Sequence, residues 1–133
     1  MNLILDTHIL IWWMHDATDR LSKVQRAALL EMEKQDRQMA LSAITLWEVA
    51  MLVERRRIAV IKPMVEFLND IDCHPLLKVL PLTTSIAFES VRLGEGLHRD
   101  PADQIIVATA RCHGLTLVTA DERIRKWGKV SLV

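Results

Sequence analysis

Four acidic residues of this 133-residue chain lie at the edge of, or inside, apolar segments, where a charge is costly. They are Asp6, Glu48, Asp103 and Asp121. A buried carboxylate without a partner takes up a proton rather than remaining charged, so four that converge make sense mainly around a cation. Carboxylate oxygens suit hard divalent cations such as Mg²⁺ or Mn²⁺. Such an ion can activate water for in-line attack on a phosphodiester, so these residue types indicate metal-dependent hydrolysis.

Two of the acids follow strand-like runs. Asp6 ends the apolar run 3–5, and Asp121 comes shortly after the run 115–119. The other two acids, Glu48 and Asp103, lie on helical patterns: each has apolar residues three and four positions away, which stack on the same side of a helix. We therefore expect two carboxylates at strand ends and two that point from helices toward a core.

Short strand-like runs alternate with helical patterns, which predicts an α/β fold with a parallel sheet and helices on both faces. The predicted strands are 2–5, 39–41, 78–80, 115–119 and 130–133. The predicted helices are 22–35, 43–57, 63–71, 85–93, 101–113 and a short one after Asp121. Ligands of such sheets bind at the carboxyl ends of the strands. We expect all four acids to meet at that edge.

Two of the predicted helices carry clear end signals. Ser22 and Gln25 form the pattern of a capping box. Asp100 is placed to cap the helix that starts with Pro101, and Gly114 comes just after its end. This last helix carries Asp103 in its first turn.

Seventeen basic and seventeen acidic residues balance to a net charge of zero, so any affinity for nucleic acid must come from local basic patches. The apolar stretch 3–14 is shorter than the roughly 20 residues of a membrane-spanning helix. Cys73 and Cys112 lack the spacing of a zinc site. We expect one domain over residues 1–133, in the cytoplasm and without a membrane segment.

Four segments carry a resemblance to a known family. They are LILDTH at 3–8, LSAITLWE at 41–48, HRDPADQIIVATA at 98–110 and LVTAD at 117–121. Together they resemble the PIN-domain ribonucleases and, within that family, the VapC-type toxins of prokaryotic toxin–antitoxin systems. A branch of the family has an aromatic residue at the position of Ala102 and often Arg at that of Gln104, so the chain departs from the commonest form there.

The resemblance implies a PIN-like, Rossmann-like three-layer fold with a short central parallel sheet. It implies that Asp6, Glu48, Asp103 and Asp121 are the catalytic acids of a Mg²⁺- or Mn²⁺-dependent endoribonuclease. Asp6 and Asp103 would bind the metal directly, with Asp100 and Asp121 as further candidates. The implied substrate is a loop of transfer RNA or ribosomal RNA, and the implied partners are a cognate antitoxin and a second copy of the chain.

Each acid also has a structural explanation. Asp100 precedes Pro101 and a helix, so N-capping alone accounts for it. Glu48 can form a buried ion pair with Arg55 or Arg56 on a neighbouring helical face. The others can cap their own helices, which is compatible with metal binding: Asp6, Asp103 and Asp121.

Neighbouring polar residues have supporting roles in this hypothesis. The hydroxyls of Thr7 and Thr119 can hydrogen-bond the carboxylates or water, or cap local turns. Arg99 is the cation closest in sequence to the acids and is a candidate phosphate contact. No histidine is assigned to the metal, because the spacings do not match a zinc site.

Two other functions remain open at this stage. A phosphorelay receiver domain also gathers acids around Mg²⁺, but it needs adjacent acids after its first strand, and Asp6 stands alone. A PIN-like module that only binds RNA or protein would usually have lost an acid, whereas all four are present.

Overall fold

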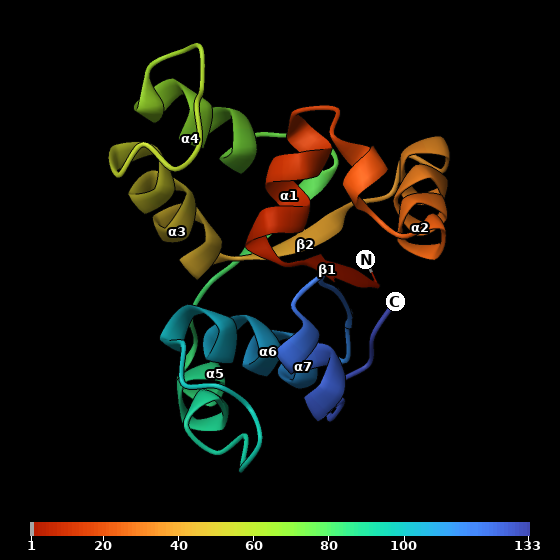
Figure 1. The fold of residues 1–133 in the computed structure, drawn as a ribbon, viewed down its shortest axis with the longest axis vertical. Coiled ribbons are helices and arrows are strands. Elements are labelled where there is room, and N and C mark those ends of the chain that lie inside the picture. The colour runs from red at the N-terminus through yellow and green to blue at the C-terminus, as the bar shows by residue number, and fades with distance from the viewer. Residues whose placement is uncertain (1) are drawn as a thin grey trace.

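The computed structural model describes residues 2–133. A four-stranded sheet with the order β3-β2-β1-β4 forms its centre, and every neighbouring pair is parallel (Figure 1). The strands are β1 (Leu3–Leu5), β2 (Met39–Ser42), β3 (Leu77–Leu80) and β4 (Thr116–Val118). The predicted α/β class with a short parallel sheet is confirmed.

Helices cover both faces of the sheet, so the fold has three layers (Figure 1). On one side lie α1 (Thr7–Met14), α2 (Lys23–Lys34), α3 (Ala43–Glu54) and α4 (Met64–Asp72), with a short 3₁₀ helix at Thr18–Arg20. On the other side lie α5 (Thr84–Ser90), α6 (Pro101–His113) and α7 (Glu122–Trp127).

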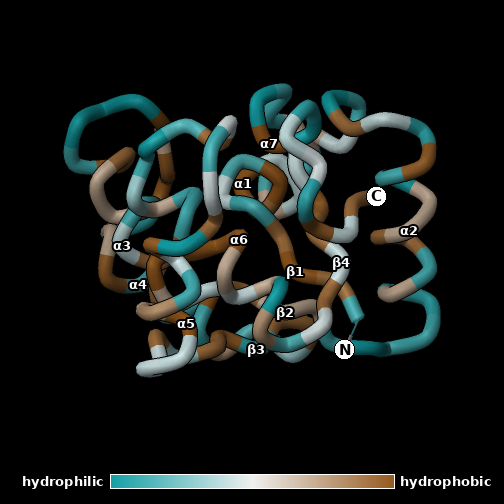
Figure 2. Tube along the Cα trace, turned by 90° about the horizontal axis from the view of Figure 1, so that it is seen from below, coloured by the Kyte–Doolittle hydropathy of each residue, from teal (hydrophilic) through white to brown (hydrophobic). Residues whose placement is uncertain are grey.

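The alternation of side chains along the strands divides the core into two halves. Leu3 and Leu5 pack into the half shared with α1, α2, α3 and α4. Ile4, between them, packs into the half that contains Ile106 and Val107 of α6. Hydrophobic residues accordingly follow β1 through the centre of the molecule (Figure 2). Both halves hold β1 in place, and with it the residue that follows β1.

The predicted end signals are confirmed. The Ser22 hydroxyl accepts from the Gln25 backbone and the Gln25 side chain accepts in return, which completes the capping box of α2. Asp100 caps α6, and Gly114 ends it in the left-handed conformation with φ 63°.

One predicted strand and two predicted helix ends are wrong. Residues 130–133 do not form a strand; only Leu132 makes a single parallel bridge, to Leu117. The helix predicted at 85–93 ends at Ser90, whose hydroxyl bonds back to the Ala87 carbonyl. The helix predicted to reach residue 57 ends at Glu54, because Arg56 adopts a left-handed φ of 55°. None of these differences moves an acid. Within residues 2–133, no helix is long and apolar enough to cross a membrane.

Candidate active site

The four predicted acids line one cavity of about 360 Å³. It lies where β1 and β4 end and where α3 and α6 begin, as expected for a parallel sheet. The complete lining is Asp6, His8, Trp12, Glu48, Asp100, Asp103, Ala120, Asp121 and Arg123. Five carboxylates thus share one small space with a single arginine.

Asp6 is the most buried of these acids, with 6% of its surface exposed. It directly follows β1 and caps α1 by accepting from the Thr7 backbone N–H at 2.8 Å. Its second oxygen accepts from the Thr119 hydroxyl at 2.6 Å. Burial raises the pKa of Asp6, and the two hydrogen bonds oppose that rise. The carboxylate is therefore fixed in place but costly to ionise without a nearby cation.

Glu48 projects from α3 toward the same space. The Thr7 hydroxyl donates to its Oε1 at 2.5 Å. Burial raises the pKa of Glu48, and the negative charges of Asp6 and Asp100 raise it further. The alternative pairing with Arg55 or Arg56 is wrong: no ion pair joins them in the part of the chain that the structure describes.

Asp103 has a strongly perturbed carboxyl group. Its side chain lies in the first turn of α6 and is 14% exposed. Burial, together with the negative charges of the surrounding carboxylates, Asp6 first among them, raises the pKa of Asp103 to about 8. A carboxyl group in this state binds a proton or a cation near neutral pH.

Asp100 and Asp121 both cap helices. One oxygen of Asp100 accepts from the backbone N–H groups of Ala102 and Asp103 at 3.0 and 3.3 Å. One oxygen of Asp121 likewise accepts from Arg123 at 2.8 Å and from Ile124. The capping expected of both residues is confirmed. In each case the cap uses Oδ1, and both residues still line the cavity.

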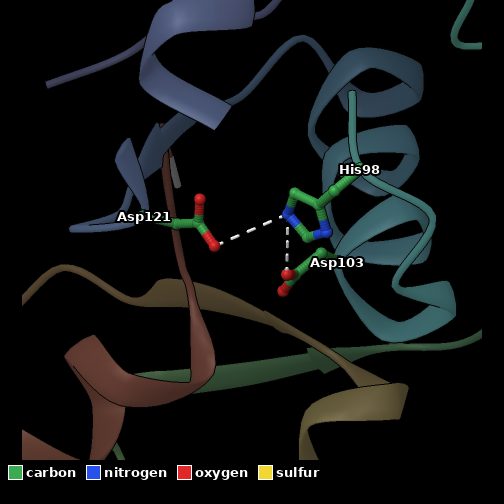
Figure 3. A group of neighbouring side chains, drawn as sticks. All are labelled: His98, Asp103 and Asp121. Carbon is green, nitrogen blue, oxygen red and sulfur yellow. Dashed lines mark ion pairs between the residues drawn. The ribbon is translucent and has the colours of Figure 1, made fainter. Parts of the chain in front are cut away.

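A histidine that the sequence analysis assigned to no site joins this group. His98 Nε2 lies 3.1 Å from Asp103 Oδ2 and 3.5 Å from Asp121 Oδ2 (Figure 3). Zinc-type spacing could not reveal it, because His98 reaches the acids from the loop before α6. The available signal was its place five residues before Asp103, in the most specific motif.

The lining of the acidic cavity does not include Arg99, the candidate phosphate contact. Arg99 lines a separate cavity of about 580 Å³ formed mainly by residues 90–97. The arginine in the lining of the acidic cavity is Arg123, just after Asp121.

The donor set fits a divalent cation. Asp103, Asp121 and His98 each offer one ligand atom, and these three atoms lie within 4.8 Å of one another. The raised pKa values of Asp6, Glu48 and Asp103 have a common cause in burial without enough positive charge. A cation in this cavity would supply the missing charge.

Comparison with known proteins identifies the family of this chain. Residues 3–130 match the model of the PIN domain. Ribonuclease VapC22 of Mycobacterium tuberculosis (strain ATCC 25618 / H37Rv) is 34% identical over 123 residues, which are 92% of this chain and 89% of that protein.

Solved structures share the fold. VapBC2 from Rickettsia felis, bound to a DNA fragment from its promoter, matches with a TM-score of 0.73 and 21% identity over 100% of this chain and 98% of that one. FitAcB from Neisseria gonorrhoeae matches with a TM-score of 0.65 and 22% identity, and the match covers 98% of this chain and 95% of that one. With a family model that spans nearly its whole length and a curated relative at 34% identity, this chain belongs to the PIN-domain family.

Proposed function

We propose that this protein is a metal-dependent endoribonuclease that acts as the toxin of a toxin–antitoxin pair. The observation that carries the proposal is the meeting of four acids from distant parts of the chain in one cavity of a PIN domain. The relationship to Ribonuclease VapC22 favours RNA as the substrate.

In this proposal Asp6, Glu48, Asp103 and Asp121 are the catalytic acids. Asp6 and Asp103 hold the metal, with Asp100 and Asp121 as further candidates. Nucleases of the PIN family generally need a divalent metal, and we propose Mg²⁺ or Mn²⁺ because the ligands are mainly carboxylates. When bound, such an ion offsets the negative charge of the phosphate and the leaving oxygen.

The protein's own residues orient the acids and handle the proton. The hydroxyls of Thr7 and Thr119 hold one oxygen each of Glu48 and Asp6, which fixes the direction of both carboxylates. Glu48 or Asp121 accepts the proton of the attacking water. A raised pKa suits Glu48 to this role, because a general base works best when its pKa is near the working pH.

The substrate and partners follow from the same proposal. Loops of transfer RNA or ribosomal RNA present unpaired bases that side chains can read. Arg123, which lines the acidic cavity, and Arg99, which lines a separate cavity, are candidates for contacts with phosphates. The structural neighbours are VapBC and FitAB-type complexes, so we propose a cognate antitoxin as a partner. We also propose that the chain forms a homodimer and that residues 1–133 are a single domain that works in the cytoplasm.

The test is to incubate antitoxin-free protein with total cellular RNA in Mg²⁺, Mn²⁺ or chelator, and to map the new RNA ends. Discrete cuts are expected with metal, and none with chelator or with the Asp6→Asn variant. Asp72→Asn, which removes an exposed acid at the end of α4, is the matched control and should cut normally. Intact RNA under every condition, from folded protein, would instead favour a module that only binds RNA or protein.

A further inference from the structure

His98 has a nitrogen whose position hydrogen bonding does not explain. Its side chain is nine-tenths buried, with 10% exposure, and its Nε2 lies against Asp103 and Asp121, two acids that line the acidic cavity. Among the described residues, Nε2 has no hydrogen-bond partner, although oxygens of Asp103 and Asp121 lie within 3.5 Å. The two carboxylate oxygens thus lie at ion-pair distance from the nitrogen without forming a hydrogen bond to it.

The two distances from Nε2 suit neighbouring ligands of one metal ion, and all three ligand atoms lie within 4.8 Å of one another. Atoms in adjacent positions around an octahedral ion, each about 2.1 Å from it, lie about 3.0 Å apart. The separations of 3.1 and 3.5 Å from Nε2 to the two carboxylate oxygens are close to this value (Figure 3). His98 comes from the loop before α6, Asp103 from α6 and Asp121 from the end of β4, so three separate segments surround one point.

One other contact of the ring has to be considered. The backbone N–H of Asp100 donates to His98 Nδ1 at 3.4 Å, on the exposed side of the ring. A neutral imidazole that binds metal through Nε2 carries its proton on Nδ1, so this contact would be lost. The contact is long and the N–H can bond to water instead, so coordination costs little here.

We propose that His98 Nε2 is a metal ligand beside Asp103 and Asp121, and that this nitrogen makes the site prefer Mn²⁺ to Mg²⁺. The inference rests on the metal site of the proposed function and gives it a ligand outside the acids. Mg²⁺ keeps to oxygen ligands and retains its waters, whereas imidazole is a good ligand for transition-metal ions.

The first measurement needs no variant. Metal-free protein labelled with ¹⁵N-histidine and its unlabelled counterpart are loaded with Mn²⁺ and compared by pulsed electron paramagnetic resonance. We expect a hyperfine coupling between Mn²⁺ and a histidine nitrogen that changes between the ¹⁵N-labelled and the unlabelled protein, as for a directly bound histidine. A spectrum without histidine coupling would overturn the proposal.

The second measurement is the affinity for Mn²⁺ and for Mg²⁺ by calorimetry, without RNA. The wild-type protein should bind Mn²⁺ about tenfold or more tightly than Mg²⁺. In His98→Ala the Mn²⁺ affinity should fall about tenfold or more, Mg²⁺ affinity should change much less, and the nitrogen coupling should disappear. His98→Gln, which offers an amide oxygen instead, should keep binding but lose most of the preference.

His113→Ala is the matched control, because His113 is an exposed histidine at the far end of α6, the helix that follows His98. Circular dichroism shows whether each metal-free variant is folded. Unchanged Mn²⁺ affinity in folded His98→Ala would contradict the proposal. Increased Mn²⁺ affinity would contradict it as well, because it would mean that the imidazole blocks the metal site.

RNA cleavage, assayed separately, distinguishes this inference from the proposed function. If the protein cleaves RNA but its Mn²⁺ has no histidine ligand, the proposed nuclease function stands and the role of His98 is rejected. Histidine-bound Mn²⁺ in a protein that never cuts RNA would support the ligand and reject the nuclease.

Discussion

Thr119 and Asp6, 113 positions apart in the chain, are joined by a 2.6 Å hydrogen bond from the threonine hydroxyl to Asp6 Oδ2. The same hydroxyl oxygen accepts from the backbone N–H of Asp121 at 3.0 Å. One side chain thus connects the acid after β1 with the acid after β4. Because β1 and β4 are neighbouring parallel strands, this connection fixes the Asp6 carboxylate relative to the backbone of Asp121.

Thr119→Val should weaken metal binding and RNA cleavage together. The change keeps the shape of the side chain but removes the donor that stabilises the charged form of Asp6, so the already raised pKa of Asp6 rises further. We expect metal affinity to fall about 10- to 100-fold, as for other residues that orient metal ligands. Thr116→Val, which removes a hydroxyl at the other end of β4, should bind metal normally; equal losses in both variants would reject the role of Thr119.

Asp103→Asn should stabilise the metal-free protein at alkaline pH. The pKa of Asp103 is about 8 in the folded chain against an ordinary value of 3.8, so the folded state holds the proton more tightly between these values. The free energy of unfolding therefore decreases as the pH rises through this window. The asparagine variant has no such penalty and should be more stable than wild type by about 1–3 kcal/mol at pH 8.5.

Urea denaturation in chelator at pH 5 and pH 8.5 measures this difference. Asp72→Asn serves as the control, since it removes an exposed acid outside the cavity. Adding Mn²⁺ should reverse the order at pH 8.5, because an ion at about 100 times its dissociation constant stabilises the wild-type fold by about 2.7 kcal/mol. An advantage of Asp103→Asn that is independent of pH would show that Asp103 is ionised throughout.

The sequence predicted the acids and most elements because their signals are local. Asp6 and Asp121 end apolar strand runs, and the cap, proline and glycine around α6 mark its limits. Residues 130–133 gave a misleading signal. Alternation of apolar residues predicts a strand, but Arg125 donates to the Val133 carbonyl, and this end of the chain pairs with β4 only at Leu132.

The part of the site that the sequence did not predict depends on contacts between distant segments. His98 lies in a loop without regular periodicity, and only the packing of α6 beside β4 brings it to Asp121. Arg99 was a candidate phosphate contact because it is the cation closest in sequence to the acids, but it lines a different cavity. Its neighbour His98 instead contacts Asp103 and Asp121. Neighbours in a loop have no fixed relation between side-chain directions, unlike residues of a helix or strand.

Gln25 links the capping box of α2 to the site, so Gln25→Leu should destabilise the fold. The buried amide donates to the Thr119 carbonyl at 2.9 Å and to the Val133 carbonyl at 3.1 Å. Leucine fills similar space but leaves these acceptors with fewer donors and breaks the capping box, a loss of about 1–3 kcal/mol. Chemical denaturation measures it, with the exposed Gln35→Leu as control; equal stability of the two variants would contradict this role.

Thr7→Val should move the acidic limb of the cleavage profile to higher pH. The Thr7 hydroxyl donates to Glu48 Oε1 and so lowers the pKa of a carboxyl group that burial raises. Without this donor, Glu48 holds its proton to higher pH and fewer molecules carry the ionised form at pH 6. Cleavage of a defined RNA from pH 5 to pH 9 at saturating Mn²⁺ measures the midpoint of the limb. Thr84→Val, at the exposed start of α5, should leave this midpoint unchanged.

Two outcomes would contradict the prediction. If Thr7→Val lowers the cleavage rate equally at every pH, the hydroxyl orients Glu48 without affecting its ionisation. If the acidic limb moves to lower pH, Glu48 is not the group that must lose a proton.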